Sequence, residues 1–161
     1  MECRDQEEPL ARTLAALVPG AVEGLIREVL IIDTGSSDQS WRVAEAAGCT
    51  FLRDADAVAV LSRARSDWVF LIEPGARPLA GWIDRFCDHM ATSRQPARLT
   101  PGGGRLSAIA RLRRPKRGMR YGLLMPREQV MAGLKRGESL AGFSRRVRAR
   151  KLACAIAPAE A

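Results

Sequence analysis

The stretch from Val29 to Asp38 reads VLIIDTGSSD and decides the fold class. It opens with four consecutive apolar residues, a pattern typical of a strand that is buried on both faces in a parallel sheet. Asp33 ends this strand. Ser36 and Gln39 then have the spacing of a capping box, which predicts that a helix begins there. The stretch therefore predicts one strand–loop–helix unit of an α/β fold.

Similar units recur along the first half of the chain. Their apolar spacing predicts helices over 9–18, 57–65 and 78–90, and strands over 50–52 and 68–72. Glu73 ends the strand over 68–72, just as Asp33 ends the strand that begins at Val29. Repeated strand–helix units of this size predict an α/β sheet with right-handed crossovers. In such a sheet ligands bind at the carboxyl ends of the strands, where both carboxylates lie.

The second half of the chain gives weaker signals. Residues 92–104, TSRQPARLTPGGG, are polar and rich in Pro and Gly, which predicts a linker or mobile loop. Beyond it the pattern predicts helices over 106–112 and 127–135, an amphipathic helix containing Leu140, Phe143 and Val147, and strands over 121–125 and 152–157. We interpret the 161 residues as one domain, in which 92–104 joins a half over 7–91 to a basic half over 105–161.

Composition excludes several classes of protein. The chain is 47% hydrophobic and 27% charged, as in ordinary soluble domains, and no apolar run approaches the roughly 18 residues of a membrane span. Residues 1–10 contain no hydrophobic segment, so no secretory signal is expected. Four scattered cysteines and one histidine, His89, predict neither a disulfide framework nor a structural zinc site. We therefore expect reduced thiols and a cytoplasmic protein.

The charge is distributed unevenly. Residues 1–90 hold nine basic and fifteen acidic residues, whereas residues 91–161 hold seventeen basic and three acidic residues. The second half therefore favours a polyanionic partner: phosphate groups, nucleic acid, or an anionic membrane surface contacted peripherally at its inner face. Because 23 of the 26 basic residues are Arg, GC-rich coding is an alternative explanation for this charge.

Three segments together resemble the family 2 glycosyltransferases, which have the GT-A nucleotide-sugar fold. Residues 7–14, EEPLARTL, are similar to the family's N-E-E-x-L-x-x-T-L helix, and residues 33–38, DTGSSD, to its D-D-G-S-x-D motif. Residues 64–83, ARSDWVFLIEPGARPLAGWI, resemble the strand that carries its D-x-D motif. The resemblance covers residues 7–86 and implies a Rossmann-like three-layer sandwich with a mostly parallel sheet. That fold would be shortened at the N-terminus, since only Met1 to Gln6 precede the first motif.

The resemblance also implies a set of site residues. Nucleotide-sugar binding would fall to Glu8, Asp33, Gly35, Ser36, Asp38, Arg65 and Arg77. Glu73 would be the metal ligand, and Gly75 stands where the family has its second D-x-D carboxylate. This altered motif predicts weak binding of Mg²⁺ or Mn²⁺. Glu138, which opens a late helix, would be the catalytic base that deprotonates the acceptor.

The function that the resemblance implies is binding of a nucleotide diphosphate sugar and transfer of the sugar to an acceptor hydroxyl by direct displacement at the anomeric carbon. The acceptor is not identified. One alternative is a catalytically inactive glycosyltransferase relative. Another is a nucleic-acid- or polyanion-binding protein that uses residues 105–151. Only Tyr121 and Phe143 supply aromatic rings in that segment, which disfavours nucleic acid because little is available for base stacking.

Overall fold

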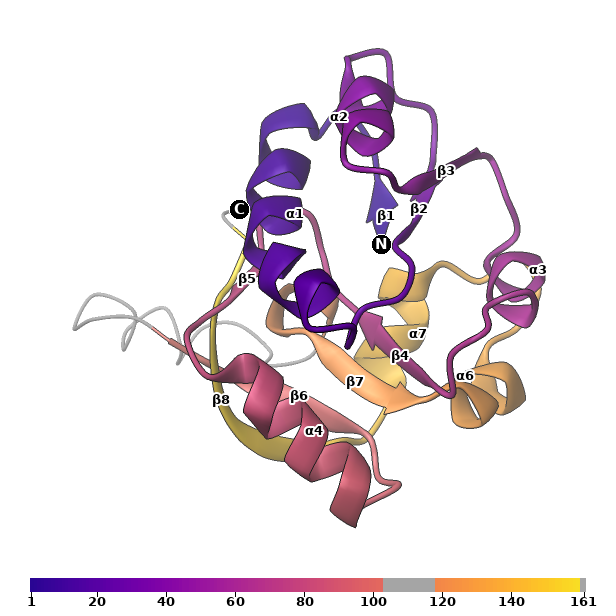
Figure 1. Ribbon diagram of the computed structural model, residues 1–161. Coiled ribbons are helices and arrows are strands. Elements are labelled where there is room, and N and C mark those ends of the chain that lie inside the picture. Colours follow the sequence, from indigo (N-terminus) through magenta and orange to yellow (C-terminus); the bar gives the residue numbers. More distant parts are fainter. Residues whose placement is uncertain (103–117, 160–161) are drawn as a thin grey trace.

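The computed structural model describes residues 1–102 and 118–159, which form two sheets (Figure 1). The first sheet is parallel and has the order β1-β2-β3, built from β1 (Glu2–Cys3), β2 (Leu30–Asp33) and β3 (Thr50–Arg53). The second has the order β4-β7-β6-β8-β5, built from β4 (Trp68–Leu71), β5 (Arg77–Pro78), β6 (Ala97–Pro101), β7 (Leu123–Pro126) and β8 (Arg150–Ala157). In this second sheet only β6 and β8 run parallel.

The α/β class predicted from the sequence is confirmed. In the first sheet the strands alternate with α1 (Glu7–Val22), α2 (Ser40–Ala46) and α3 (Ala57–Ser62). The remaining helices are α4 (Trp82–Thr92), the 3₁₀ turn η1 (Met119–Tyr121), α6 (Arg127–Gly133) and α7 (Leu140–Arg146). The parallel pairing expected of the whole sheet is restricted mainly to β1–β3, because β7, β8 and β5 mostly return antiparallel to their neighbours.

The strand that precedes α1 has two residues. Glu2 lies opposite Ile32 and Cys3 opposite Asp33, and the chain then turns into α1. β1 and β4 are each one of the two edge strands of their sheets in the described part of the chain, and they do not pair with each other, so the two sheets are separate.

Two predicted helix starts are wrong. Ser36 and Gln39 do not form a capping box. Helix α2 begins after Gln39 with no side-chain cap, because the Ser36 hydroxyl bonds Asp33 instead. Helix α4 begins at Trp82 rather than at Pro78, which is part of β5. Gly81 separates the two with a φ of +79°, a left-handed conformation that no helix can include.

The predicted linker over 92–104 is also wrong. Its residues Ala97–Pro101 form β6, which lies between β7 and β8 in the second sheet. Arg98 is buried there, and its guanidinium donates to the carbonyl of Gly118 at 2.8 Å and to that of Ser144. Because the segment contains this charged side chain, its composition predicts a loop, although the segment is a buried strand. The helix predicted over 106–112 lies outside the described residues.

Helix α1 packs along the core through Leu10, Leu14 and Leu17, all of them buried. Trp82 and Phe86 of α4 stack edge to face in the same cluster, with ring centroids 5.1 Å apart. None of the helices in residues 1–102 and 118–159 is long and apolar enough to span a bilayer.

We expect Gly20→Ala to destabilise the fold. A Cβ on Gly20 of α1 would lie 2.3 Å from Cη2 of the buried Trp82 ring, so the ring or the helix must shift. Overpacking of this kind costs about 1–3 kcal/mol, more than the helix propensity gained from alanine. Urea unfolding measures the change. Ala21→Ser, at the next and exposed position, is the control and should stay within about 0.5 kcal/mol of wild type. Equal stability of both variants would contradict the close packing of α1 on α4.

Candidate functional site

The first turns of α1 connect the carboxyl ends of β2 and β4. On one side, the backbone N–H of Glu7 donates to Oδ2 of Asp38 at 3.0 Å. On the other, the N–H of Gly75 donates to the carbonyl of Pro9 at 2.9 Å and to Oγ1 of Thr13 at 2.7 Å. The loop after β2 and the loop after β4, which carry the predicted residues Asp33 and Glu73, are thus held against one helix.

The carboxylate of Asp33 organises the loop that follows β2. It is only 1% exposed, and its oxygens accept hydrogen bonds from the Ser36 N–H at 3.2 Å and from the Ser36 hydroxyl. The Cys3 thiol contacts it from β1, with Sγ 3.6 Å from Oδ1. Burial, followed by the charge of Asp33, raises the pKa of Cys3 to about 11, so this thiol stays protonated. Asp33 therefore holds the loop instead of facing solvent.

A second carboxylate, Asp5, joins this loop to the segment after β1. Its Oδ1 accepts from the N–H of Ser37 at 2.7 Å and from the Ser37 hydroxyl at 3.0 Å, and its own N–H donates to Oγ of Ser36 at 3.0 Å. The hydrogen bonds from Ser37 lower the pKa of Asp5. The role of Asp5 was not predicted from the sequence, since its partners lie more than 30 positions away and no local motif marks it.

Asp38 also accepts hydrogen bonds from both neighbouring helices. Besides accepting from Glu7, it accepts from the N–H of Ser40, at 3.0 Å. Burial opposes ionisation of Asp38, but hydrogen bonds from Ser40 and then Glu7 lower its pKa overall. Gly35, at the tip of the same loop, has a φ of +101° and open space where a Cβ would stand. The exposed backbone around Gly35 is consequently the accessible part of the loop.

The loop after β4 offers one carboxylate. Glu73 is half-buried, and Gly75 follows it with a φ of +92°, packed against Pro9 and Ala159. Within residues 1–102 and 118–159 no group of three or more His, Cys, Asp or Glu side chains could hold a metal ion. Glu73 alone does not make a tight metal site, because carboxylate-bound cations need further protein or substrate oxygens.

Arg120 is a positively charged residue beside this loop. It was not predicted from the sequence to belong to the site. The Glu73 N–H donates to the carbonyl of Met119 at 3.2 Å. Arg120 follows Met119 in the chain and therefore lies close to Glu73. Its guanidinium donates to the carbonyl of Ala159, and its buried Nε has no hydrogen-bond partner in the described part of the structure. Because Nε is buried, a ligand could reach it only if the Arg120 side chain moved.

Two predicted residues, Arg65 and Arg77, lie outside this network of hydrogen bonds, and a third, Glu8, lies in α1 with its side chain exposed to solvent. Arg65 is at the amino ends of the strands, where its N–H donates to Oε1 of Glu28, before β2, at 3.1 Å. Arg77 is exposed in β5, opposite Ala157. Glu8 is in the first turn of α1, but its side chain is 81% exposed and ion-paired with Arg12 at 3.7 Å.

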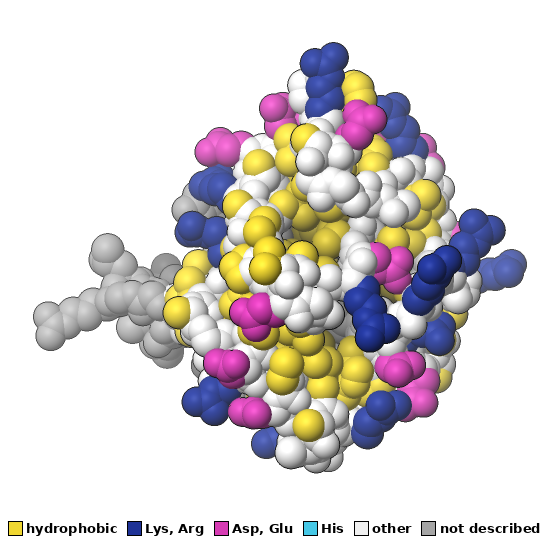
Figure 2. Space-filling model, viewed as in Figure 1, with side chains coloured by type: hydrophobic (Ala, Val, Ile, Leu, Met, Phe, Trp, Pro, Cys, Tyr) yellow, Lys and Arg dark blue, Asp and Glu magenta, His cyan; other side chains and the backbone are white. Residues whose placement is uncertain are grey.

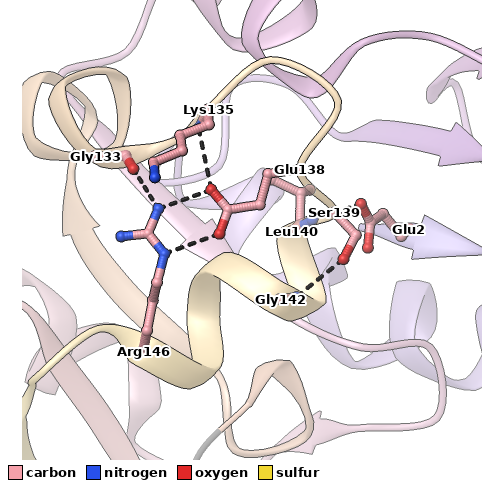
Figure 3. Close-up of polar contacts among 8 residues, drawn as sticks. All are labelled: Glu2, Gly133, Lys135, Glu138, Ser139, Leu140, Gly142 and Arg146. Atoms are coloured by element: carbon pink, nitrogen blue, oxygen red, sulfur yellow. Dashed lines mark hydrogen bonds and ion pairs between the residues drawn. The ribbon is translucent and has the colours of Figure 1, made fainter.

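The predicted base Glu138 forms an ion pair with Arg146 (Figure 3). Its oxygens accept from Nε of Arg146 at 2.8 Å and from Nη2 at 2.7 Å, and also from the N–H of Lys135 at 3.1 Å. The hydrogen bonds from Arg146, followed by that from Lys135, lower the pKa of Glu138 to about 2. Its role as a general base stays a prediction, which this low pKa opposes because such a carboxylate binds protons weakly.

Glu2 holds the start of α7 beside Glu138, as Figure 3 shows. Its carboxylate accepts from the N–H of Leu140 at 2.5 Å and of Ala141 at 3.1 Å, while Oγ of Ser139 accepts from Gly142 at 3.0 Å. These bonds satisfy the free N–H groups of the first turn. The region around Glu138 is thus a helix cap supported by an ion pair.

The fold resembles that of glucosyl-3-phosphoglycerate synthase from Mycobacterium tuberculosis. The structure of that enzyme with Mn²⁺ and UDP-glucose has a TM-score of 0.66 and 16% sequence identity, covering 99% of this chain and 69% of that chain. Its complex with phosphoglyceric acid has a TM-score of 0.67 and 15% identity, covering 99% and 70%. No family model and no curated protein matches the sequence. At these identities the likeness shows a shared GT-A-like fold alone.

We expect the Glu138–Arg146 pair to stabilise the protein in a pH-dependent way. The folded pKa of about 2 lies below the ordinary value of 4.5, so the stabilisation is complete above pH 4.5 and is lost as the pH falls toward 2. Glu138→Gln should therefore lower the unfolding midpoint at pH 7, and its difference from wild type should shrink between pH 4.5 and 2. Arg146→Gln should act in the same way, and the double variant should add little further loss. Additive losses at pH 7 would contradict the pairing.

Proposed function

We propose that this chain binds a nucleoside diphosphate sugar across the first turns of α1. The observation that carries the proposal is the attachment of both strand-end loops to that helix, through Asp38 on one side and Gly75 on the other. The loops occupy the ligand-binding end of an α/β sheet. The fold is similar over nearly the whole chain to an enzyme whose structures contain UDP-glucose and UDP.

In this proposal the loop over 33–38 receives the nucleoside. Its exposed backbone at Gly35 supplies N–H and C=O groups, while the buried Asp33 fixes their positions through Ser36. This assignment differs from the direct hydrogen bond to the base that the family resemblance implies for Asp33, since the Asp33 carboxylate is already occupied. Substrate recognition would thus depend on Asp33 through loop geometry.

The diphosphate would lie toward Glu73 and Arg120. The surroundings are acidic, with Glu7 and Glu8 in the first turn of α1, so a diphosphate needs compensating positive charge. Arg120 supplies a guanidinium whose geometry suits phosphate, and it would have to turn from the carbonyl of Ala159 toward the ligand. Mg²⁺ or Mn²⁺, where bound, would neutralise the diphosphate, with Glu73 as its one protein carboxylate. Arg65 and Arg77 are not needed for this arrangement.

The reaction that we propose is transfer of the sugar to an acceptor hydroxyl. The acceptor oxygen would form a bond to the anomeric carbon as the bond to the departing diphosphate breaks, and the hydroxyl proton would pass to a base. Glu138 is the base that the family resemblance implies, and its pairing with Arg146 would have to open first. The nucleic-acid or polyanion alternative uses residues 105–151, of which 105–117 lie outside the described part of the chain.

Calorimetry with UDP-glucose tests the binding proposal. We expect saturable binding by the wild-type protein, and about tenfold weaker binding by Ser36→Ala and Asp33→Asn, because a loosened loop loses on the order of 1.4 kcal/mol. Asp88→Asn, on the exposed side of α4, is the matched control and should bind like wild type. Circular dichroism confirms that each variant is folded. Absence of saturable binding to UDP-glucose and to other common nucleotide sugars would refute the proposal.

The same titration with UDP tests the source of positive charge. We expect Mn²⁺, compared with chelator, to change the affinity by less than about threefold, and Arg120→Gln to weaken binding about tenfold with or without metal. Glu73→Gln should remove the remaining effect of Mn²⁺. Gly75→Asp is unsuitable as a test, since its φ of +92° strains any other residue. Binding that is lost in chelator and insensitive to Arg120→Gln would contradict this assignment.

A further inference from the structure

The loop over 33–38 lies at an exposed and charged end of the molecule. Figure 2 shows hydrophobic side chains gathered between the positions of α1 and α4 in Figure 1, whereas acidic and basic side chains lie at the top of the view, around α2. The loop joins β2 to α2, and its residues Thr34, Gly35 and Ser37 are exposed. Because these residues offer little apolar surface, discrimination between nucleotide bases at the loop has to come from hydrogen bonds.

Three aspartates form hydrogen bonds with this loop, and two of them have both carboxylate oxygens engaged. Asp33 is 1% exposed, and the N–H of Ser36 lies 3.2 Å from each of its oxygens. Asp38 accepts from Glu7 through Oδ2 and from Ser40 through Oδ1. Neither carboxylate can accept from a ligand without weakening a bond that holds the backbone.

The third aspartate, Asp5, has an exposed side chain, and Ser37 engages only one of its oxygens. The N–H and the hydroxyl of Ser37 both donate to Oδ1, at 2.7 Å and 3.0 Å, which leaves Oδ2 to accept from a ligand. The backbone of Asp5 has a φ of +50°, a left-handed conformation that aspartate and asparagine tolerate better than most residues. This turn lets Asp5 direct both its N–H, which donates to Ser36, and its carboxylate to the same loop.

We propose that Asp5 selects nucleotides whose base carries a ring N–H, as uracil and guanine do, by accepting that hydrogen through Oδ2. The inference rests on the proposed function, which places the nucleoside at this loop. An ionised carboxylate can only accept, so it attracts N3–H of uracil or N1–H of guanine and repels the lone pair that cytosine or adenine carries at that position. The exposed backbone at Gly35 offers donors and acceptors alike, which suit ribose hydroxyls but do not separate the bases.

Calorimetry of UDP and of CDP with the intact protein tests this assignment, since the two nucleotides differ only along one edge of the base. We expect the wild type to bind UDP about tenfold more tightly than CDP, a modest ratio because Asp5 is exposed to water. In Asp5→Asn, Ser37 still needs an acceptor, so the amide oxygen replaces Oδ1 and the NH₂ group replaces Oδ2. That NH₂ group donates to N3 of cytosine, and the ratio should fall to about one or below.

Asp54→Asn is the matched control. Asp54 is also an exposed aspartate with a left-handed φ, +47°, and it directly follows the neighbouring strand β3. Its side chain forms no hydrogen bond with the loop in the described part of the structure, so this variant should keep the wild-type ratio. Asp5→Gly, which the φ of +50° accommodates, removes the carboxylate and should abolish the preference even where Asp5→Asn does not fold.

The outcomes separate this inference from the proposed function. If no nucleotide binds, both are refuted. Equal affinity of the wild type for UDP and CDP overturns selection by Asp5 alone. An equal loss of both affinities in Asp5→Asn also overturns it, because Asp5 would then only position the loop. A third nucleotide, 2′-deoxy-UDP, reports on the ribose: if Asp5→Asn removes the difference between it and UDP but keeps the preference for UDP over CDP, the carboxylate binds the ribose and the inference is wrong.

Discussion

The attachment of both strand-end loops to the first turns of α1 is the interaction on which the rest of the structure depends. Glu2 and Cys3 pair with Ile32 and Asp33, and the chain turns away at once into α1. Both short-strand residues have further tasks, because the Glu2 carboxylate caps α7 and the Cys3 thiol contacts Asp33. A strand this short does not connect the two sheets in the described part of the chain. The position of one sheet relative to the other therefore depends on α1 and on the packed core.

The carboxylates at the candidate site hold the backbone in place, a role that a sequence motif does not show. Asp33 and Asp38 both end up bonded to backbone N–H groups of their own loop or of α1. Because these hydrogen bonds engage their oxygens, the two residues fix the shape of the loop. In the proposed complex the nucleoside diphosphate would therefore meet the exposed backbone at Gly35 and not the buried carboxylate of Asp33.

The sequence predicted the elements whose signals are local. The strands at 30–33 and 68–71 are continuous apolar runs, and α7 has its apolar residues at helical spacing. β6 was missed because its burial depends on β7 and β8, which are distant in the chain, and because Arg98 and two prolines disguise it. The positions of Asp33 and Glu73 at strand ends were predicted correctly. The contributions of Asp5 and Arg120 were not, since their partners lie more than 30 residues away.

The candidate site and an apolar cavity of about 320 Å³ share the same two strands. β2 and β4 carry the site loops at their carboxyl ends, and residues along the whole of β4 line the cavity together with the segment before β2. At the site end, hydrogen bonds from α1 set the separation of the strands. The hydrogen bonds of α1 to Asp38 and Gly75 are thus the contacts that fix the two loops of the candidate site relative to each other.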